Sequence, residues 1–300
     1  MIRRQGYING LVYDPNAQAR RNGRWRTCCS RPTWSRSDWP VRRAATRCRP
    51  GPAKSARWKP STTAGSQLHL SEPGETVNYV ENHDNHTLYD TNVFKLPLAT
   101  SGAGTRVQIL GVAINAFSQG VAYFHAGIDT LRSKSLDRNS FNSGDWFNRI
   151  DWSYQDNYFG TGLPPEADNG KDYALIKPLL ANAALKLAPA DIAFTRDAFR
   201  DLLRIRASST LFRLRSAADI RQRLRFYNTG AQQVPTVIAA RIDGKGYPGA
   251  HYQAVNYFIN VDKEERAIAL DAAVAARMRL HPAHRSDPAR RRRPTTAPPG

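Results

Sequence analysis

Residues 76–90 read TVNYVENHDNHTLYD, and this segment decides the fold. Its first five residues are β-branched or aromatic except for one asparagine, which predicts a short strand over 76–80. The polar run over 81–86 cannot continue a buried strand, so the strand ends there. In parallel α/β folds the working side chains lie at the carboxyl ends of strands, and His83 and Asp84 occupy that position.

Helices and a second strand follow this segment. Apolar residues recur at helical spacing in three places, which cover about 104–118, 173–186 and 192–207. Residues 121–125 (VAYFH) form a short apolar strand, and a long polar loop runs from 127 to about 158. The alternation of strands and helices predicts an α/β body over 68–208 with a parallel sheet or a barrel.

The pattern changes near residue 209. Short β-type segments separated by Gly, Pro, Asn and Asp cover 224–228, 235–242, 254–260 and 267–270. These segments predict a small antiparallel β domain over 209–286.

The charge of the chain is unevenly distributed. The 300 residues carry a formal net charge of +19, which on its own is typical of nucleic-acid binders. Residues 17–67 contribute +12 and residues 281–300 contribute +4, whereas the body over 68–280 carries +2. A nearly neutral body argues against nucleic acid as the partner. No apolar run is long enough to span a membrane, and residues 1–10 contain no apolar signal-peptide core. The sequence therefore assigns the protein to no cellular compartment.

The basic segment 17–67 has no globular pattern. From the set Leu, Ile, Val, Met, Phe and Tyr it contains one residue, Val41, although it holds four of the six tryptophans. Such a segment cannot bury enough apolar surface to offset its chain entropy, so we expect it to be disordered. Its richness in Arg, Trp, Cys, Pro and Ser fits a G+C-rich coding sequence read in a wrong frame, and the alternative is a basic arm that stacks on nucleic acid. The basic tail 287–300 permits the same two interpretations.

Two segments are candidates for chemistry. At His83 and Asp84, an imidazole and a carboxylate can bind sugar hydroxyls or face a developing cation, although an Asx-rich turn that caps the next helix explains the same residues. The spacing of His83 and His86 is a weak metal motif, because a third ligand is missing. The loop over 131–149 combines Trp and Phe rings with amides and charges, which suits carbohydrate rings, or it is an ordered surface loop that packs its own aromatics.

The segment VNYVENHDNHTLYD at 77–90 resembles the strand-7 motif of the α-amylase superfamily of glycoside hydrolases, in the form found in pullulanases and limit dextrinases. Residues 120–152 are similar to strand 8 and the loop after it in those enzymes. Residues 6–16 (GYINGLVYDPN) resemble the piece between strands 6 and 7. The resemblance covers 5–16 and 68–286 and leaves out the basic segment.

This resemblance implies a (β/α)8 barrel, of which 68–208 supplies strands 7 and 8 with the helices that follow them, and a C-terminal β-sandwich over 209–286. Residues 1–16 are implied to be a barrel remnant between strands 6 and 7. The family uses a retaining mechanism, with an Asp nucleophile after strand 4 and a Glu acid/base after strand 5. Neither of these two motifs occurs in the 300 residues, so we expect the chain to be inactive as a hydrolase.

The resemblance also implies roles for individual residues. Asp84 is implied to stabilise the transition state, and the implied substrate-binding residues are His83, Asn85, Lys134, Arg138, Asn139 and Asp145. No metal site or cofactor is expected for this chain, although the intact family allows a structural calcium ion. The implied partner is an α-glucan such as pullulan, glycogen or limit dextrin. Binding to nucleic acid or to a membrane is not expected. Intact relatives are often secreted or periplasmic.

The sequence therefore predicts a fragment of a debranching glycoside hydrolase that cleaves α-1,6-glucosidic bonds of starch or glycogen. Two alternatives remain, a noncatalytic α-glucan-binding remnant and a basic nucleic-acid-binding protein that uses the charge of 17–67. Because an incomplete barrel leaves strand edges unpaired, we also expect the isolated chain to self-associate.

Overall fold

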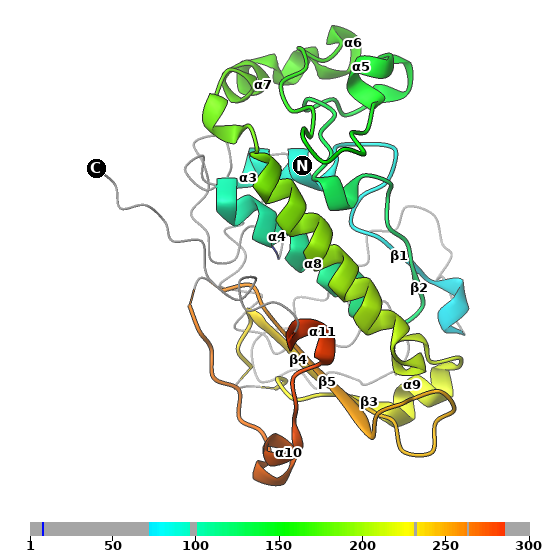
Figure 1. Ribbon diagram of the computed structural model, residues 1–300. Coiled ribbons are helices and arrows are strands. Elements are labelled where there is room, and N and C mark those ends of the chain that lie inside the picture. Colours follow the sequence, from blue (N-terminus) through cyan, green and yellow to red (C-terminus); the bar gives the residue numbers. More distant parts are fainter. Residues whose placement is uncertain (1–7, 9–71, 97–100, 231–232, 263, 286–300) are drawn as a thin grey trace, which may run out of the picture.

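Figure 1 shows the computed structural model, which describes Ile8 and residues 72–96, 101–230, 233–262 and 264–285. Three predicted segments lie outside the described residues, namely 1–16 apart from Ile8, 17–67 and 287–300. Within the described ranges, no helix is both long enough and apolar enough to cross a membrane.

The first part of the described chain is a β-α-β unit. Its elements are strand β1 (Val77–Asn78), helices α3 (Leu88–Lys95) and α4 (Ser101–Phe117), and strand β2 (Val121–Ala122). The two strands are parallel, and Val77 lies opposite Val121. The predicted α/β alternation and parallel pairing are therefore confirmed, although both strands are shorter than predicted.

Helix α3 was not among the predicted helices. It begins at a cap, because the side-chain oxygen of Thr87 accepts a hydrogen bond from the backbone N–H of Asp90 at 3.1 Å. Two polar residues of this helix, Asp90 and Asn92, are buried. Buried polar residues hide the apolar period on which a helix prediction depends.

A long loop with short helical turns separates β2 from helix α8 (Pro189–Ala207). The turns and helices in it are η2 (Ile128–Thr130), η3 (Ser140–Asn142), α5 (Asp145–Asn148), α6 (Glu166–Asn169), η4 (Gly170–Asp172), α7 (Tyr173–Leu180) and η5 (Ala183–Leu185). The single helix predicted over 173–186 is thus divided between α7 and η5. Asn182 begins the second piece, since its side-chain oxygen accepts from the backbone N–H of Ala184 at 3.0 Å. Helix α8 packs along α4 (Figure 1).

The last part of the chain contains an antiparallel sheet with the strand order β3 (Leu224–Phe226), β4 (Val237–Asp243) and β5 (Ala254–Asn260). The region predicted as an all-β domain, 209–286, holds this sheet together with helices η6 (Thr210–Arg213), α9 (Ala217–Arg223), α10 (Ala272–Arg277) and α11 (Pro282–Arg285), and the sandwich stays a prediction. The strand predicted at 267–270 does not form. Its side chains do alternate in burial, but no strand pairs with it within the described residues.

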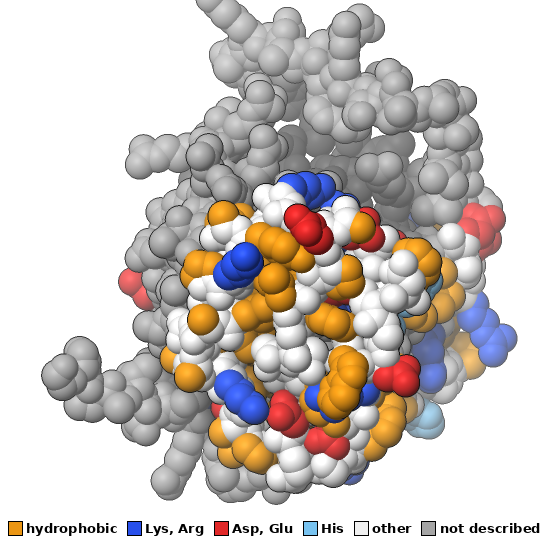
Figure 2. All heavy atoms as spheres, turned by 90° about the horizontal axis from the view of Figure 1, so that it is seen from above, with side chains coloured by type: hydrophobic (Ala, Val, Ile, Leu, Met, Phe, Trp, Pro, Cys, Tyr) orange, Lys and Arg blue, Asp and Glu red, His pale blue; other side chains and the backbone are white. Residues whose placement is uncertain are grey.

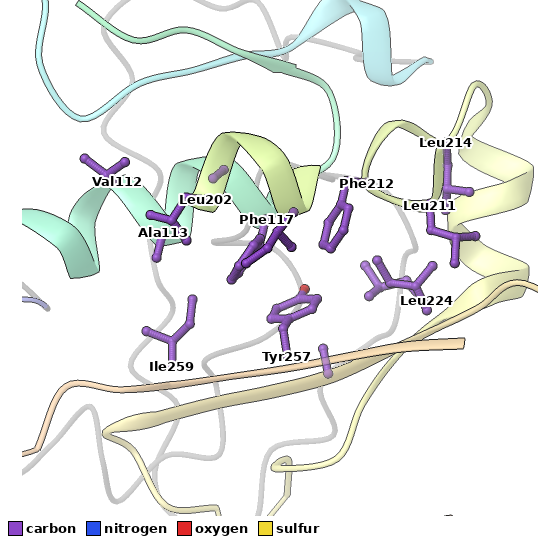
Figure 3. Packing of buried hydrophobic residues seen from close by; sticks show 14 of the residues in the cluster. Val112, Ala113, Phe117, Leu202, Leu211, Phe212, Leu214, Leu224, Tyr257 and Ile259 are labelled. Carbon is purple, nitrogen blue, oxygen red and sulfur yellow. The ribbon is translucent and has the colours of Figure 1, made fainter. Parts of the chain in front are cut away.

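One hydrophobic core joins the helices to this sheet. Val112 and Phe117 of α4, Leu202 of α8 and Tyr257 of β5 belong to this core (Figure 3), and the ring centroids of Phe117 and Tyr257 are 5.5 Å apart. Phe117 also stacks on Phe212, with ring centroids 5.4 Å apart. Each buried side chain of this size stabilises the fold by about 1.5–3 kcal/mol. The sheet is therefore packed against the helices. The same core contains residues from both sides of the domain boundary predicted after residue 208, and that boundary stays a prediction.

The β1–β2 sheet exposes one apolar face. Val77 and Tyr79 are 54% and 56% exposed, and Val121 and Tyr123 are 45% and 37% exposed. The alternation of side chains along a strand places these four residues on the same face. Neither strand pairs with any other strand within the described residues.

We therefore expect the isolated chain to self-associate through this face, because an open strand edge beside exposed apolar side chains favours pairing between chains. Sedimentation velocity should show association that rises with protein concentration. Val121→Lys should shift the chain toward the monomer, whereas Leu203→Lys, a control at a residue that is 37% exposed on α8, should not. A wild-type chain that stays monomeric at high concentration would contradict the prediction.

Candidate functional site

Two buried side chains meet at the carboxyl ends of β1 and β2. Glu81 follows β1 and is 5% exposed, and its Oε1 lies 3.1 Å from Nδ1 of His125, which follows β2. Its Oε2 accepts a hydrogen bond from the backbone N–H of Leu88 at 2.5 Å. A buried carboxylate is costly unless it is hydrogen-bonded, so both contacts of Glu81 are needed in the folded state. They connect the end of β1 to the end of β2 and to the start of α3.

The predicted site residues His83, Asp84 and Asn85 form an exposed turn after β1. Oδ1 of Asn82 accepts hydrogen bonds from the backbone N–H of His83 at 2.8 Å and from the Tyr123 hydroxyl at 3.0 Å. Asn85 adopts the left-handed conformation, with φ at 60°, and its Nδ2 donates to Oδ2 of Asp84 at 3.2 Å. The structure therefore presents the side chains of His83 and Asp84 to solvent on a fixed turn.

Lys134 supports this turn from the loop after β2. Its side chain is buried, and its Nζ donates to the backbone carbonyl of His83. Its backbone N–H donates to Oδ2 of Asp90 at 2.8 Å, and the Ser133 hydroxyl donates to Oδ1 of Asp90 at 2.5 Å. Burial lowers the pKa of Lys134 and raises the pKa of Asp90 to about 6. Lys134 is thus the predicted loop residue that contacts the turn. It does so as a buried side chain that bonds the turn's backbone.

The other predicted loop residues have their own contacts. Burial, and to a smaller extent the charge of Arg138, lowers the pKa of His86 to about 4. Nδ2 of Asn139 donates to Oδ2 of Asp168 at 2.9 Å. Asp145 is exposed at the start of α5. Among the described residues, no hydrogen bond or ion pair connects these three side chains to the exposed turn.

The backbone of the loop is strained. Seven described non-glycine residues have a positive φ, and five of them lie in the loop over 127–158. Leu131, Ser135 and Leu136, near Lys134, have φ values of 57°, 52° and 64°. Each such residue costs about 1 kcal/mol or more, and strained residues cluster at functional sites. The strain is consistent with a functional role of this loop.

An exposed tryptophan lies on the same loop. The guanidinium carbon of Arg149 lies 4.7 Å from the ring centroid of Trp146 and 3.7 Å from that of Tyr158. Trp146 is 66% exposed, so Arg149 supports an indole ring that remains open to solvent. Figure 2 looks down on the end of the molecule that carries α5, where hydrophobic side chains lie among charged ones. A supported, exposed aromatic ring is well suited to pack against a sugar ring.

Comparison with known proteins identifies relatives of the chain. A family described as "Alpha-1,6-glucosidases, pullulanase-type, C-terminal" matches residues 154–297. The chain is 43% identical to the chloroplastic pullulanase 1 of Arabidopsis thaliana over 222 residues, which are 71% of this chain and 23% of that protein. It is 36% identical to pullulanase from Klebsiella aerogenes over 176 residues, which are 58% of this chain and 16% of that protein. The chain is therefore a relative of pullulanase-type α-1,6-glucosidases, and residues 154–297 match their C-terminal region.

Solved pullulanase structures are similar as well. Apo pullulanase from Klebsiella pneumoniae is 35% identical, with a TM-score of 0.61 over 65% of this chain and 22% of that one. The maltotriose complex of the pullulanase from the same organism is 34% identical, with a TM-score of 0.62 and the same coverage. The chain thus spans a quarter or less of the length of these relatives.

The sequence analysis missed two groups of this candidate site, the Glu81–His125 contact and Asp90. His125 ends the second predicted strand, so its position at a strand end was a usable signal. Asp90 lies inside a helix and carried no comparable signal. Among the described residues, no group of three or more His, Cys, Asp and Glu side chains is arranged to hold a metal ion.

Proposed function

We propose that the exposed turn at 83–85 and the loop over 131–149 form part of an α-glucan-binding surface in a debranching glycoside hydrolase. The observation that carries the proposal is that a buried polar network fixes the turn while its side chains face solvent. Lys134 bonds the carbonyl of His83 from inside, and the Glu81 carboxylate holds the adjacent strand end. A preorganised polar surface of this kind binds a ligand without first ordering its own groups.

The chemistry of the turn suits a sugar. The exposed Asp84 carboxylate can accept hydrogen bonds from two hydroxyl groups, and the His83 imidazole can bond a third. In an intact enzyme, a carboxylate at this position would stabilise the positive charge that develops on the sugar ring in the transition state. Crystal structures of Klebsiella pneumoniae pullulanase with maltotriose support an α-glucan as the ligand class.

We further infer the architecture in which this surface works. The parallel β1–β2 pair with its covering helices fits the last two strands of a (β/α)8 barrel, whose ligands bind at the carboxyl ends of the strands. The β3–β5 sheet fits one layer of a C-terminal β-sandwich. In this arrangement the exposed apolar face of β1 and β2 would point into the barrel interior.

The test is glucan binding by the 300-residue chain, measured by affinity electrophoresis in gels that contain pullulan. Trp146→Ala and Asp84→Asn should each weaken binding by about tenfold, because each removes a contact of roughly 1.4 kcal/mol with the sugar. Trp152→Ala is the matched control, since this tryptophan is 60% exposed but has no cation–π partner within the described residues. Equal binding by the wild type and both site variants would contradict the proposal.

A further inference from the structure

A second surface lies on the β3–β5 sheet, at the opposite end of the molecule from α5 (Figure 1). The register of the sheet places Arg225 opposite Arg241, and Arg241 opposite Asn256. Side chains alternate along a strand, so these three residues lie on the face that points away from Tyr257 and the core. We call this face the outer face of the sheet.

The two arginines on the outer face form no ion pair within the described residues, although Asp243 lies on the same face two residues after Arg241. One guanidinium nitrogen of Arg225 donates to the backbone carbonyls of Arg221 at 2.6 Å and Leu224 at 3.0 Å, and Arg241 makes no side-chain hydrogen bond within the described residues. Like charges directly opposite each other destabilise a sheet, and an anion bound between them would remove that repulsion.

Two aromatic rings lie in the next row of the outer face. Tyr227 and Phe258 flank Ala239, and their rings are parallel to within 6° with centroids 6.5 Å apart. Phe258 is 41% exposed, and the Tyr227 hydroxyl donates to Oδ1 of Asn256 at 2.7 Å. This bond fixes the tyrosine ring, and the amide nitrogen of Asn256 makes no side-chain hydrogen bond within the described residues.

We propose that the outer face binds an α-glucan that carries phosphate groups. The parallel rings offer flat apolar surface for sugar rings, and Asn256 offers a donor for a hydroxyl. The arginine pair offers forked donors that match phosphate oxygens. A sugar polymer is favoured over a single-stranded nucleic acid because the body over 68–280 carries only +2, whereas such binders line a groove with positive charge. The choice of α-glucan rests on the function proposed above.

The experiment compares two polymers that differ only in phosphate, namely phosphorylated amylopectin before and after treatment with phosphatase. Affinity electrophoresis of the 300-residue chain should show binding to the phosphorylated polymer that is about tenfold tighter or more. Arg225→Gln with Arg241→Gln should remove this difference, and Phe258→Ala should weaken binding to both polymers. Arg213→Gln with Arg215→Gln removes two exposed charges outside the sheet and should retain the difference.

Three results would overturn the proposal: equal binding to both polymers, loss of the difference in the Arg213/Arg215 control, or displacement of the phosphorylated polymer by a single-stranded oligonucleotide at equal phosphate concentration.

Thermal melting of each variant checks folding, and removal of one arginine should not destabilise the chain because it relieves repulsion. Trp146→Ala distinguishes the two proposed surfaces. If it leaves binding unchanged while phosphate dependence persists, the first surface fails and the outer face stands; the reverse pattern overturns only the outer face.

Discussion

The purified 300-residue chain is expected to release no reducing sugar from pullulan above a buffer blank. Retaining glycosidases need two carboxyl groups about 5–5.5 Å apart, one to attack the anomeric carbon and one to protonate the leaving oxygen. Asp84 is a single exposed carboxylate, and it cannot perform both steps at once. Loss of such a pair removes a rate factor of at least about a millionfold.

The neighbouring carboxylates do not offer a substitute pair. Glu81 is buried, and its two oxygens are engaged by His125 and the backbone of Leu88. Asp151 accepts hydrogen bonds from the Ser153 hydroxyl at 2.6 Å and from the backbone N–H of Asp156 at 2.8 Å, and these bonds lower its pKa to about 2. A carboxyl group with so low a pKa would not serve as a general acid at neutral pH.

The measurement is a reducing-sugar assay at equal molar concentrations of this chain and of Klebsiella pneumoniae pullulanase as the positive control. Asp84→Ala accompanies the wild type. If the wild type were active and the variant inactive, the chain would contain a complete catalytic pair, and Asp145 would be the first candidate for the second carboxylate. Activity in both proteins would instead indicate a contaminating enzyme.

The elements that sequence pattern predicted well are those whose pattern and packing agree. Strand β5 has its predicted bounds, because Val255, Tyr257 and Ile259 recur at every second position and turn residues lie on both sides. Helix α8 extends three residues before its predicted start, to a proline at its first position. Helix α3 could not be found, because Asp90 and Asn92 are buried for tertiary reasons that no local pattern contains.

The position of the candidate site could be predicted from the sequence, but the buried contacts that fix the turn could not. Rules for parallel sheets place functional side chains at strand ends, and that is where Glu81, the exposed turn and His125 lie. The direction of the Lys134 side chain depends on a loop with positive φ at Leu131, Ser135 and Leu136, which are residue types that rarely adopt that conformation. Sequence pattern therefore left Lys134 as a candidate ligand, whereas the structure gives it an internal partner.

The buried Asp90 side chain also leads to a prediction of how the free energy of unfolding depends on pH. Burial raises the folded-state pKa of Asp90 to about 6, so between about pH 4 and 6 the folded chain holds a proton that the unfolded chain releases. The contribution of Asp90 to stability therefore falls as pH rises through this window, by about 3 kcal/mol. His86 acts in the opposite direction. Burial, with the charge of Arg138, lowers its pKa to about 4, so its contribution rises by a similar amount between about pH 4 and 6.5.

The two contributions should nearly cancel in the wild type, and single substitutions should separate them. Asp90→Asn leaves only the histidine, so its free energy of unfolding, relative to the wild type, should rise between pH 4 and 6. His86→Gln leaves only the aspartate, so its free energy of unfolding should fall over the same range. Urea unfolding followed by circular dichroism at several pH values measures both slopes, and the double variant is the control that should restore the wild-type profile. Parallel profiles for all four proteins would mean that neither group is buried with the protonation state described, and that the Ser133 and Lys134 contacts hold Asp90 ionised throughout.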